Sequence, residues 1–579
     1  MSRNQGTTEG MTQARRLQRA RQITEDLFLL LSAVCFVYNC MEMSKLKISF
    51  PSGFGTQLML VLALVMIARL ILRRKGRWEI LWVGLPLSLV CMETYITTGR
   101  YARLPFIAIL IMGLDGIDYR KILRTYLVAV GSYITATVLA GLGGGVSDLV
   151  YYRDGLRSSW GTAYPTDFSS VILFLTMTVW LARPELSNAG MLALGLVPIL
   201  LALLITGSRN SLICGILFEI VVIYRCLEIG IFSRKRRFRR IQQCVDTLLT
   251  LALPVCAATI LLLVFLYSKN PELMERANFL LSERLRLSVQ GFQNYPLLPF
   301  GNWIITNGGM GGTVFFKVAA DQYFFLDSSY VSMLLRYGWV TTLGLSAVWI
   351  WMTRRAIRAG NRRMALVMAV VAVHSIMEHH FPDFFHNILL IMPLAKLRNE
   401  TTDERVACPT RRTVAFGAVM AVLLALGVLF LPRVMSWLRT IYGAMGWQNG
   451  EATDSVLGLN VALIAGIAGA AWAAYRLLTC LIERRQRQIA FPAVVLALCL
   501  TLGFGVCLWG NGVIEDAVLN NAALVEADAD ALTRLGDVTI CSDVLPEVYR
   551  RRFGNIRPTV YGGEDLARYP GATVLTRMP

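Results

Sequence analysis

Long apolar segments alternate with short polar segments through most of this chain of 579 residues. An α-helix of about 20 apolar residues crosses a bilayer, and segments close to this length recur between residues 26 and 508. We count twelve apolar segments within residues 26–396 and three more within residues 413–508. The pattern predicts an all-α polytopic membrane protein with about 12 core and 3 additional transmembrane helices.

The polar segments define the remaining parts of the chain. Residues 1–25 are too long and polar for a cleaved signal peptide, so we expect the first apolar segment to be retained as a helix. Most connections are short, but residues 268–328 form a large loop between the ninth and tenth apolar segments. The polar linker 397–412 separates the membrane domain, residues 26–396, from the three additional helices.

The C-terminal segment, residues 509–579, has a different pattern. Runs typical of strands alternate with runs typical of helices, in the order DVTICS (537–542), LPEVYRRRF (545–553), RPTVY (557–561), GGEDLARY (562–569) and ATVLT (572–576). This alternation predicts a small α/β tail domain outside the membrane. Its small size favours a docking or stabilising role over a catalytic one.

Basic residues are unevenly distributed along the chain. The 57 Lys and Arg exceed the 38 Asp and Glu, which gives a net charge of +19. They concentrate in alternate loops, such as RRKGR (73–77), RKRRFRR (234–240), RRAIRAGNRR (354–363) and ERRQR (483–487). Because cytoplasmic loops are enriched in Lys and Arg, we expect a cytoplasmic N-terminus and an extracytoplasmic C-terminus. Contact with membrane lipids explains the charge, and nucleic acid is not an expected partner.

Motifs for nucleotide and metal binding are missing from the sequence. It contains neither GxxxxGK[ST] nor HExxH, and the glycine-rich stretch GLGGG (141–145) follows a membrane segment rather than a strand. The 12 cysteines are scattered without a CxxC pair. We therefore expect no cofactor and no metal, and the sequence disfavours an ATPase or a metalloprotease.

Several arginines lie in the segments that we expect on the outer face. Arg209 occupies the tight turn TGSRN between two apolar segments, Arg157 precedes another, and Arg284 and Arg286 belong to the large outer loop. Each side chain can extend to lipid phosphates. Guanidinium groups also bind phosphate in a bidentate manner and stay charged. Several such arginines on different segments therefore favour a diphosphate-binding site.

Carboxylates and histidines on the same face supply candidates for proton transfer. Asp327 opens the tenth apolar segment, where it can cap a helix or accept a proton from a sugar hydroxyl. The 4 histidines of the chain cluster in VHSIMEHHFPDFFHN. Within this stretch, the short turn MEHHFPDFF contains Glu378, His379 and His380. This turn is either an interfacial polar turn or an acid/base and acceptor-binding site.

Five stretches occur in an order that resembles the O-antigen polymerase and O-antigen ligase superfamily of bacterial membrane glycosyltransferases. RSSWGTAYPTDF is similar to its R-x-S-x-G-x-x-x-P-N-x-F stretch, with Thr166 replacing asparagine, and TGSRNSL is similar to its Ser-Arg-Gly turn, with Asn210 replacing glycine. The others are ERLRLSVQGFQNYPLLPFGN, DSSYVSMLLRYGW and MEHHFPDFFHNILL. The resemblance covers roughly residues 20–400, so the last three helices and the tail fall outside it.

The resemblance implies a helical fold of the lipid-sugar-dependent (GT-C-like) glycosyltransferase type in the bacterial cytoplasmic membrane. Such enzymes use a polyprenyl-diphosphate-linked oligosaccharide without metal or nucleotide. The polymerase branch transfers the glycan onto a lipid-linked repeat unit of a surface polysaccharide, such as O-antigen, capsule or exopolysaccharide. The ligase branch transfers it to a different acceptor and usually carries histidine where Asp327 stands, so this departure favours a polymerase. A chain-length regulator and a flippase of the same pathway are the expected partners.

The chemistry of the outer-face residues and the resemblance together assign roles to individual side chains. We expect Arg209 and Arg284 to bind the diphosphate, with Arg157 as a third candidate and Arg286 as a weaker one. Asp327 is the leading base. The reserve bases, Glu378, His379 and His380, and the sugar-contacting candidates, Tyr295, Trp303 and Tyr330, complete the predicted site.

Alternatives remain open for the aromatic residues and for the function. The three aromatic residues also fit a belt at the membrane interface. A ligase is the strongest rival function, followed by a lipid-linked oligosaccharide flippase or transporter. A transporter is expected to place charged residues inside the helices that line its cavity, whereas most apolar segments here are nearly free of charge.

Overall fold

The computed structural model describes most of the first 399 residues. The described ranges are 2–72, 78–99, 101–142, 146, 150–152, 156–183, 186, 188–230, 239–306 and 324–399, followed by 469–470, 473, 477, 492–499, 501, 540–542, 556–558 and 573–575. Most of the linker 397–412 and of the three additional predicted helices lies outside these residues.

The described part is predominantly α-helical, as expected of a polytopic membrane protein. Seven of its helices are long and apolar enough to cross a membrane. They are α1 (Ser2–Cys40), α2 (Phe54–Leu72), the π-helical turn Ile80–Gly84 with α3 (Leu85–Thr98), α5 (Tyr119–Leu142), α6 (Pro165–Ala182), α8 (Arg209–Gly230) and α9 (Arg239–Lys269). Leucines such as Leu64, 66% exposed, and Leu89, 61% exposed, face outward from the bundle. Apolar side chains on a bundle surface are stable against lipid and costly in water.

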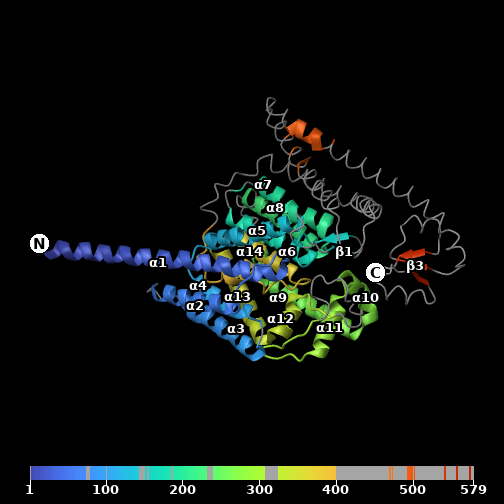
Figure 1. Cartoon of the computed structure of the whole chain (residues 1–579), viewed down its shortest axis with the longest axis horizontal. Helices are drawn as coiled ribbons and strands as arrows, with labels where there is room; N and C mark the ends of the chain where they lie inside the picture. The colour runs from blue at the N-terminus through green and yellow to red at the C-terminus, as the bar shows by residue number, and fades with distance from the viewer. Residues whose placement is uncertain are drawn as a thin grey trace.

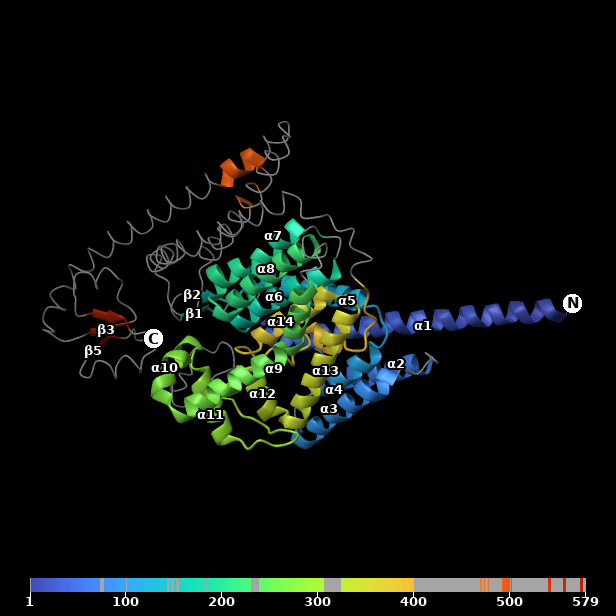
Figure 2. The same ribbon diagram turned by 180° about the vertical axis from the view of Figure 1, so that it is seen from behind.

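Further helices complete the bundle. They are α4 (Arg103–Gly113), α7 (Asn188–Leu201), which continues as a π-helical turn (Ala202–Thr206), α12 (Ser329–Arg336), α13 (Gly338–Arg358) and α14 (Arg362–His374). Helices α6 and α14 are largely buried, and their neighbours surround them (Figure 1). The start of α1 projects from one end of the bundle, whereas β1, α10 and α11 lie at the opposite end (Figures 1 and 2).

Two predicted membrane segments have a different structure. The segment 329–352 is divided at Tyr337, where α12 ends and α13 begins. The predicted helix 385–396 is wrong: these residues form turns around one short 3₁₀ helix, Ile388–Ile391. Pro393 lacks an N–H and disfavours helical backbone before it. The segment has the hydropathy of a membrane helix because its apolar side chains are buried inside the bundle.

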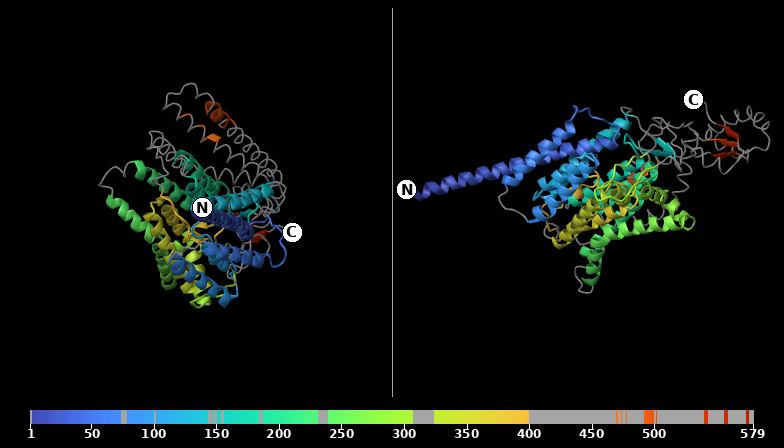
Figure 3. Two further views of the ribbon diagram at one scale, coloured as in Figure 1. Left: turned by 90° about the vertical axis from the view of Figure 1, so that its left-hand side faces the viewer. Right: turned by 90° about the horizontal axis from the view of Figure 1, so that it is seen from below.

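We call the end of the bundle opposite the start of α1 the polar end. The β1–β2 hairpin and helices α10 and α11 form it. Strands β1 (Val150–Tyr152) and β2 (Leu156–Ser158) form an antiparallel hairpin that precedes α6. Helices α10 (Pro271–Leu280) and α11 (Arg284–Asn294) follow α9 (Figure 3). This end also receives the end of α1, because the backbone N–H of Ala163 donates to Met43 O at 2.7 Å.

An ion-pair network joins three helices away from the polar end. Arg362, which opens α14, lies 2.7 Å from a carboxylate oxygen of Glu228 on α8 and also pairs with Asp246 on α9. Arg225 contacts the other Glu228 oxygen at 2.7 Å. Since Glu228 is buried, these contacts compensate for its charge and fix α8, α9 and α14 relative to one another.

The tail contains three described strands, and they confirm the strand pattern at those residues. Strands β3 (Ile540–Ser542), β4 (Ile556–Pro558) and β5 (Thr573–Leu575) form a parallel sheet in the order β4-β3-β5. Parallel neighbours require crossover connections, as an alternating α/β sequence provides. The predicted helices between these strands lie outside the described residues.

Candidate active site

The segment 375–387, between α14 and the 3₁₀ helix, carries the histidine-rich turn into the interior. Hydrogen bonds from side chains satisfy its non-helical backbone. The Tyr126 hydroxyl of α5 donates to Phe385 O at 2.8 Å, and Asn387 Nδ2 donates to Phe381 O at 3.0 Å. Non-helical backbone at membrane depth is stable where the protein itself supplies such partners. This support fixes the side chains of the turn in place.

Arg284 lies between two carboxylates from other parts of the chain. It is the first residue of α11, and its Nε is 3.5 Å from Asp327 Oδ2, whereas its terminal nitrogen Nη2 is 3.3 Å from Glu378 Oε1. The Glu378 side chain is 3% exposed and that of Asp327 is 20% exposed. The structure therefore brings together three of the predicted site residues, with Asp327 the more accessible carboxylate.

The helix-capping role considered for Asp327 is wrong. Ser328 is the N-cap residue of α12, and its side chain makes no capping hydrogen bond. The next residue, Ser329, donates from its backbone N–H to Glu378 O at 3.2 Å, and its hydroxyl donates to the same oxygen. Asp327 and Glu378 are thus positioned by a direct link between the start of α12 and the histidine-rich turn.

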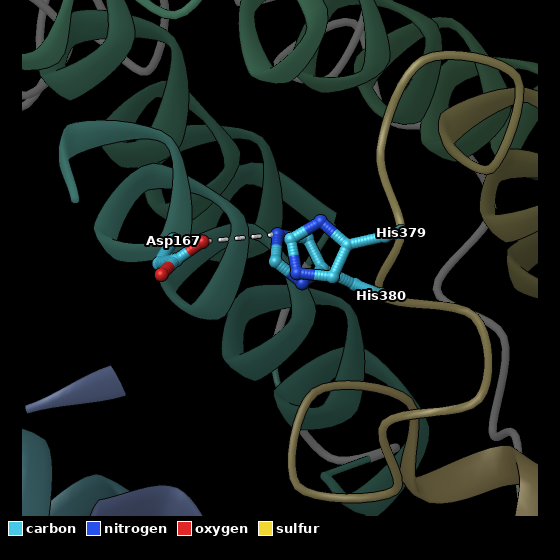
Figure 4. A group of neighbouring side chains, drawn as sticks. All are labelled: Asp167, His379 and His380. Atoms are coloured by element: carbon cyan, nitrogen blue, oxygen red, sulfur yellow. Dashed lines mark ion pairs between the residues drawn. The ribbon is translucent and has the colours of Figure 1, made fainter. Parts of the chain in front are cut away.

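His380 connects this pair of carboxylates to two further ones. Its Nε2 lies 3.5 Å from Asp167 Oδ1 and 3.9 Å from Glu378 Oε2, and its Nδ1 lies 3.7 Å from Asp383 Oδ2. Asp167 is in the first turn of α6, across from the turn that carries His379 and His380 (Figure 4). The polar cluster therefore continues from Arg284 into the bundle.

Arg103 compensates for the charge of another buried carboxylate, Asp383. It opens α4 and forms ion pairs with Asp383 and with Glu42, which follows α1. The Asp383 side chain is 4% exposed, that of Arg103 is 25% exposed and that of Glu42 is 59% exposed. The arginine thus links a buried acid to a surface acid.

Burial and neighbouring charges shift the pKa values of this non-helical turn in opposite directions. Burial raises the pKa of Glu378 to about 7, although Arg284 acts in the opposite sense. Burial lowers the pKa values of His379 and His386 well below their usual range. The neighbouring carboxylates raise the pKa of His380 against the effect of burial, and Arg103 helps to hold the pKa of Asp383 well below its usual range.

The other predicted arginines occupy different positions. Arg157 Nε donates to Thr206 O at 2.6 Å, and its side chain packs against Gly207, so Arg157 supports the turn before α8. Arg209 is exposed at the first residue of α8. Arg286 pairs with Glu283 at 3.2 Å on the half-exposed face of α11. The structure thus places Arg157 beside the Arg209 turn and Arg284 within the carboxylate cluster.

The helix that Arg209 opens is tied to the cluster through its next residues. Asn210 Nδ2 donates to His374 O at 3.1 Å. The hydroxyl of Ser170 on α6 lies 3.2 Å from His374 Nε2 and 3.5 Å from the Ser211 hydroxyl. The N-terminus of α8 therefore lies against the N-terminal part of α6 and the C-terminus of α14, beside the histidine-rich turn.

The three predicted aromatic residues differ in accessibility. Trp303 is 48% exposed and lies 5.9 Å from the ring of Tyr101. Tyr295 follows α11 and stacks on Phe324 at 6.1 Å. Tyr330 is buried, and its hydroxyl donates to Ala372 O at 2.7 Å. Trp303 is thus a surface aromatic of the large loop, Tyr295 is partly buried against the core, and Tyr330 packs α12 against α14.

The cluster also contains groups of side chains with the composition of a metal site. The sets are Asp167, His379 and His380; His380, Asp383 and His386; and Asp327, Glu378 and His379. Within each set the ligand atoms lie within 4.8 Å of one another. The expectation of no metal rested on the absence of a linear motif, and non-helical backbone brings these side chains together without one.

Sequence analysis missed Asp167 and Arg103. Each has a visible signal, because a lone charged residue stands at the start of an apolar segment, in PTDFSSVILFL and in RLPFIAIL. The sequence does not show which residues these two contact. Arg103, for example, pairs with Asp383, which is 280 positions away.

No family model, curated protein or solved structure matches this chain.

Proposed function

We propose that this chain is a surface-polysaccharide polymerase that transfers a polyprenyl-diphosphate-linked glycan onto a lipid-linked repeat unit. In this proposal the fold is of the GT-C-like type, and the polar end faces outward from the bacterial cytoplasmic membrane. The large loop, with α10 and α11, belongs to that end.

One observation carries the proposal. Arg284 lies within 3.5 Å of the carboxylates of Asp327 and Glu378, and the three residues belong to three separate stretches that resemble the polymerase and ligase superfamily. A cation between two acids at the membrane surface provides both requirements of glycosyl transfer from a diphosphate. It compensates for charge on the leaving group, and a nearby base accepts the acceptor proton.

The reaction breaks the bond between the anomeric carbon and the diphosphate oxygen, and it forms a bond from that carbon to an acceptor hydroxyl oxygen. The guanidinium of Arg284 stabilises the negative charge that develops on the departing diphosphate. The hydroxyl proton moves to Asp327, whose side chain is 20% exposed and so accessible to an acceptor. Protonation of Asp327 balances the charge that leaves with polyprenyl diphosphate.

Donor binding also frees the base. In the structure Asp327 is within ion-pair distance of Arg284. A diphosphate that binds the guanidinium competes with Asp327, since both are anions that bind the same nitrogen atoms. Glu378 is 3% exposed and remains behind Arg284, so it acts as a positioning residue that orients the arginine toward the membrane surface. Arg209, exposed at the start of α8, is the second diphosphate contact in this proposal.

The resemblance also includes ligases, which transfer the same kind of glycan to a different acceptor. The carboxylate of Asp327 favours the polymerase, because a ligase of this superfamily usually carries histidine at the matching position. A flippase is the weaker alternative because the cluster around Arg284 joins three stretches that resemble the polymerase and ligase superfamily.

The test is the lipid-linked glycan profile of a deletion strain. We expect single repeat units to accumulate on the outer face, polymer to disappear, and the wild-type gene to restore it. At equal protein level, Asp327→Asn should fail to restore polymer, whereas Glu93→Gln, an exposed carboxylate on α3, should restore it. Long chains retained on the carrier lipid would indicate a ligase, and repeats on the inner face a flippase. Either profile would contradict the proposal.

A further inference from the structure

We propose that Asp167, His379 and His380 bind a divalent ion of the first transition row, of the class of Zn²⁺, Mn²⁺ or Co²⁺. Asp167 comes from the first turn of α6, and the two histidines come from the turn after α14 (Figure 4). The ion therefore joins a helix to a non-helical segment more than two hundred residues away in the sequence.

The geometry of the three side chains suits such an ion. His380 Nε2 lies 3.5 Å from Asp167 Oδ1, and the three ligand atoms lie within 4.8 Å of one another. Bonds of about 2.0–2.2 Å hold ligand atoms about 3–4 Å apart around zinc. The side chains thus need to move by less than about 1 Å to coordinate an ion.

Buried ring nitrogens without close hydrogen bonds are a second indication of a ligand. His380 is 1% exposed, and its nitrogens lie 3.5 Å from Asp167 and 3.7 Å from Asp383, longer than ordinary hydrogen bonds in the part of the chain that the structure describes. The buried Nδ1 of His379 likewise has no hydrogen-bond partner among those residues. Buried polar atoms are nearly always satisfied by a protein group, a water molecule or an ion.

The charge of the surrounding cluster also favours a cation. Four carboxylates lie around the histidines, namely Asp167, Asp327, Glu378 and Asp383. Among the described residues their ion-pair partners include two arginines, Arg103 and Arg284. The carboxylates thus outnumber these two arginines, so a further cation can be accommodated among them.

The other two sets of candidate ligands are less suitable. In the set of His380, Asp383 and His386 the carboxylate pairs with Arg103. In the set of Asp327, Glu378 and His379 both carboxylates pair with Arg284. Asp167, by contrast, pairs with His380 itself. Its side chain is 13% exposed and the ring of His379 is half-buried, so an ion can enter there.

The ligand types select the class of ion. Two imidazoles and one carboxylate suit zinc, manganese and cobalt, whereas magnesium and calcium prefer oxygen ligands throughout. The glycosyl transfer proposed above uses no metal, and the ion has a positioning role in fixing the turn that contains Glu378. Metal binding is measured by itself, so this inference holds or fails independently of the proposed reaction.

The test uses the full chain, purified without a histidine tag and treated with a chelator. Titration with Co²⁺, followed by visible absorption, should show one saturable site per chain. Asp167→Asn and His379→Gln should each weaken binding by at least about tenfold, and Glu93→Gln on α3 should bind as the wild type does. Size-exclusion profiles will establish that each variant is folded, and Asp167→Asn carries the test if His379→Gln fails to fold.

Two outcomes would overturn the assignment. The first is the absence of saturable Co²⁺ binding by the wild-type chain. The second is unchanged binding in folded Asp167→Asn. If His386→Gln then loses binding, the ion lies on the other face of His380, where the His386 ring stacks at 4.0 Å.

Discussion

Arg103 and Asp383 form an ion pair across 280 positions of sequence. The pair links the first residue of α4 to the histidine-rich turn, and the Asp383 side chain is 4% exposed. A carboxylate at this depth is stable as an anion because the guanidinium compensates for its lost hydration. The pair therefore secures the non-helical turn that supports the candidate active site.

Removal of Arg103 is expected to destabilise the protein strongly. Arg103→Met leaves the Asp383 carboxylate buried without its guanidinium partner, a change that costs about 3–5 kcal/mol in comparable pairs. The measurement is thermal unfolding in detergent. Glu42→Gln is the control because Glu42 pairs with the same arginine but its side chain is 59% exposed, so the loss should be at most about 1 kcal/mol.

A double variant separates the pair from its surroundings. If the buried anion causes the loss, Arg103→Met combined with Asp383→Asn should lose less stability than the sum of the two single variants. Additive losses would show that Arg103 acts through packing on the Phe385 ring, which lies 5.0 Å from its guanidinium carbon.

The close approach of α1 and α4 gives a second prediction. A Cβ atom at Gly113 would lie 2.0 Å from the Phe28 ring, and Phe28 is fully buried. Gly113→Ala should therefore destabilise the protein by about 1–3 kcal/mol through overpacking. Gly131 on α5 is a matched helical glycine with nothing within 4 Å of its Cβ position, so Gly131→Ala should be neutral or stabilising by up to about 1 kcal/mol. Equal losses in thermal unfolding would contradict this packing.

The network around Glu228 gives a third prediction. Glu228→Gln removes the charge that compensates for Arg225 and Arg362, so two arginines remain close together with less compensation. We expect a loss of about 2–4 kcal/mol in unfolding free energy. Glu93→Gln, which changes an exposed carboxylate on another helix, should be within about 0.5 kcal/mol of wild type. A neutral Glu228→Gln would mean that helix packing alone fixes α8, α9 and α14.

The candidate site could be predicted in part because its residues mark the boundaries between polar and apolar segments. Asp327 and Glu378 each stand at such a boundary, Arg284 lies in the loop between two apolar segments, and a bundle brings the polar residues on one side together. Which arginine meets the carboxylates depends on tertiary contacts. Arg286, two residues from Arg284, lies on another face of α11 and pairs locally with Glu283.

The rest of the site depends on backbone geometry that hydropathy does not encode. Residues 385–396 have the hydropathy of a membrane helix, but Pro393 and side-chain hydrogen bonds favour turns, and the turn that precedes them brings His379 and His380 toward Asp167. The expectation of no metal considered only linear motifs, and these residues form none. The metal-site geometry was therefore invisible to motif analysis.

Transfer by the purified chain tests the central claim most directly. The chain is reconstituted with a polyprenyl-diphosphate-linked repeat unit, and polymer length is followed over time. Arg284→Lys keeps the charge but loses the planar fork, so we expect the rate to fall by about 100-fold or more. Arg276→Lys, an exposed arginine on the neighbouring helix α10, should transfer at the wild-type rate. Wild-type polymerisation by a folded Arg284→Lys variant, or no polymer from the wild-type chain, would contradict the account.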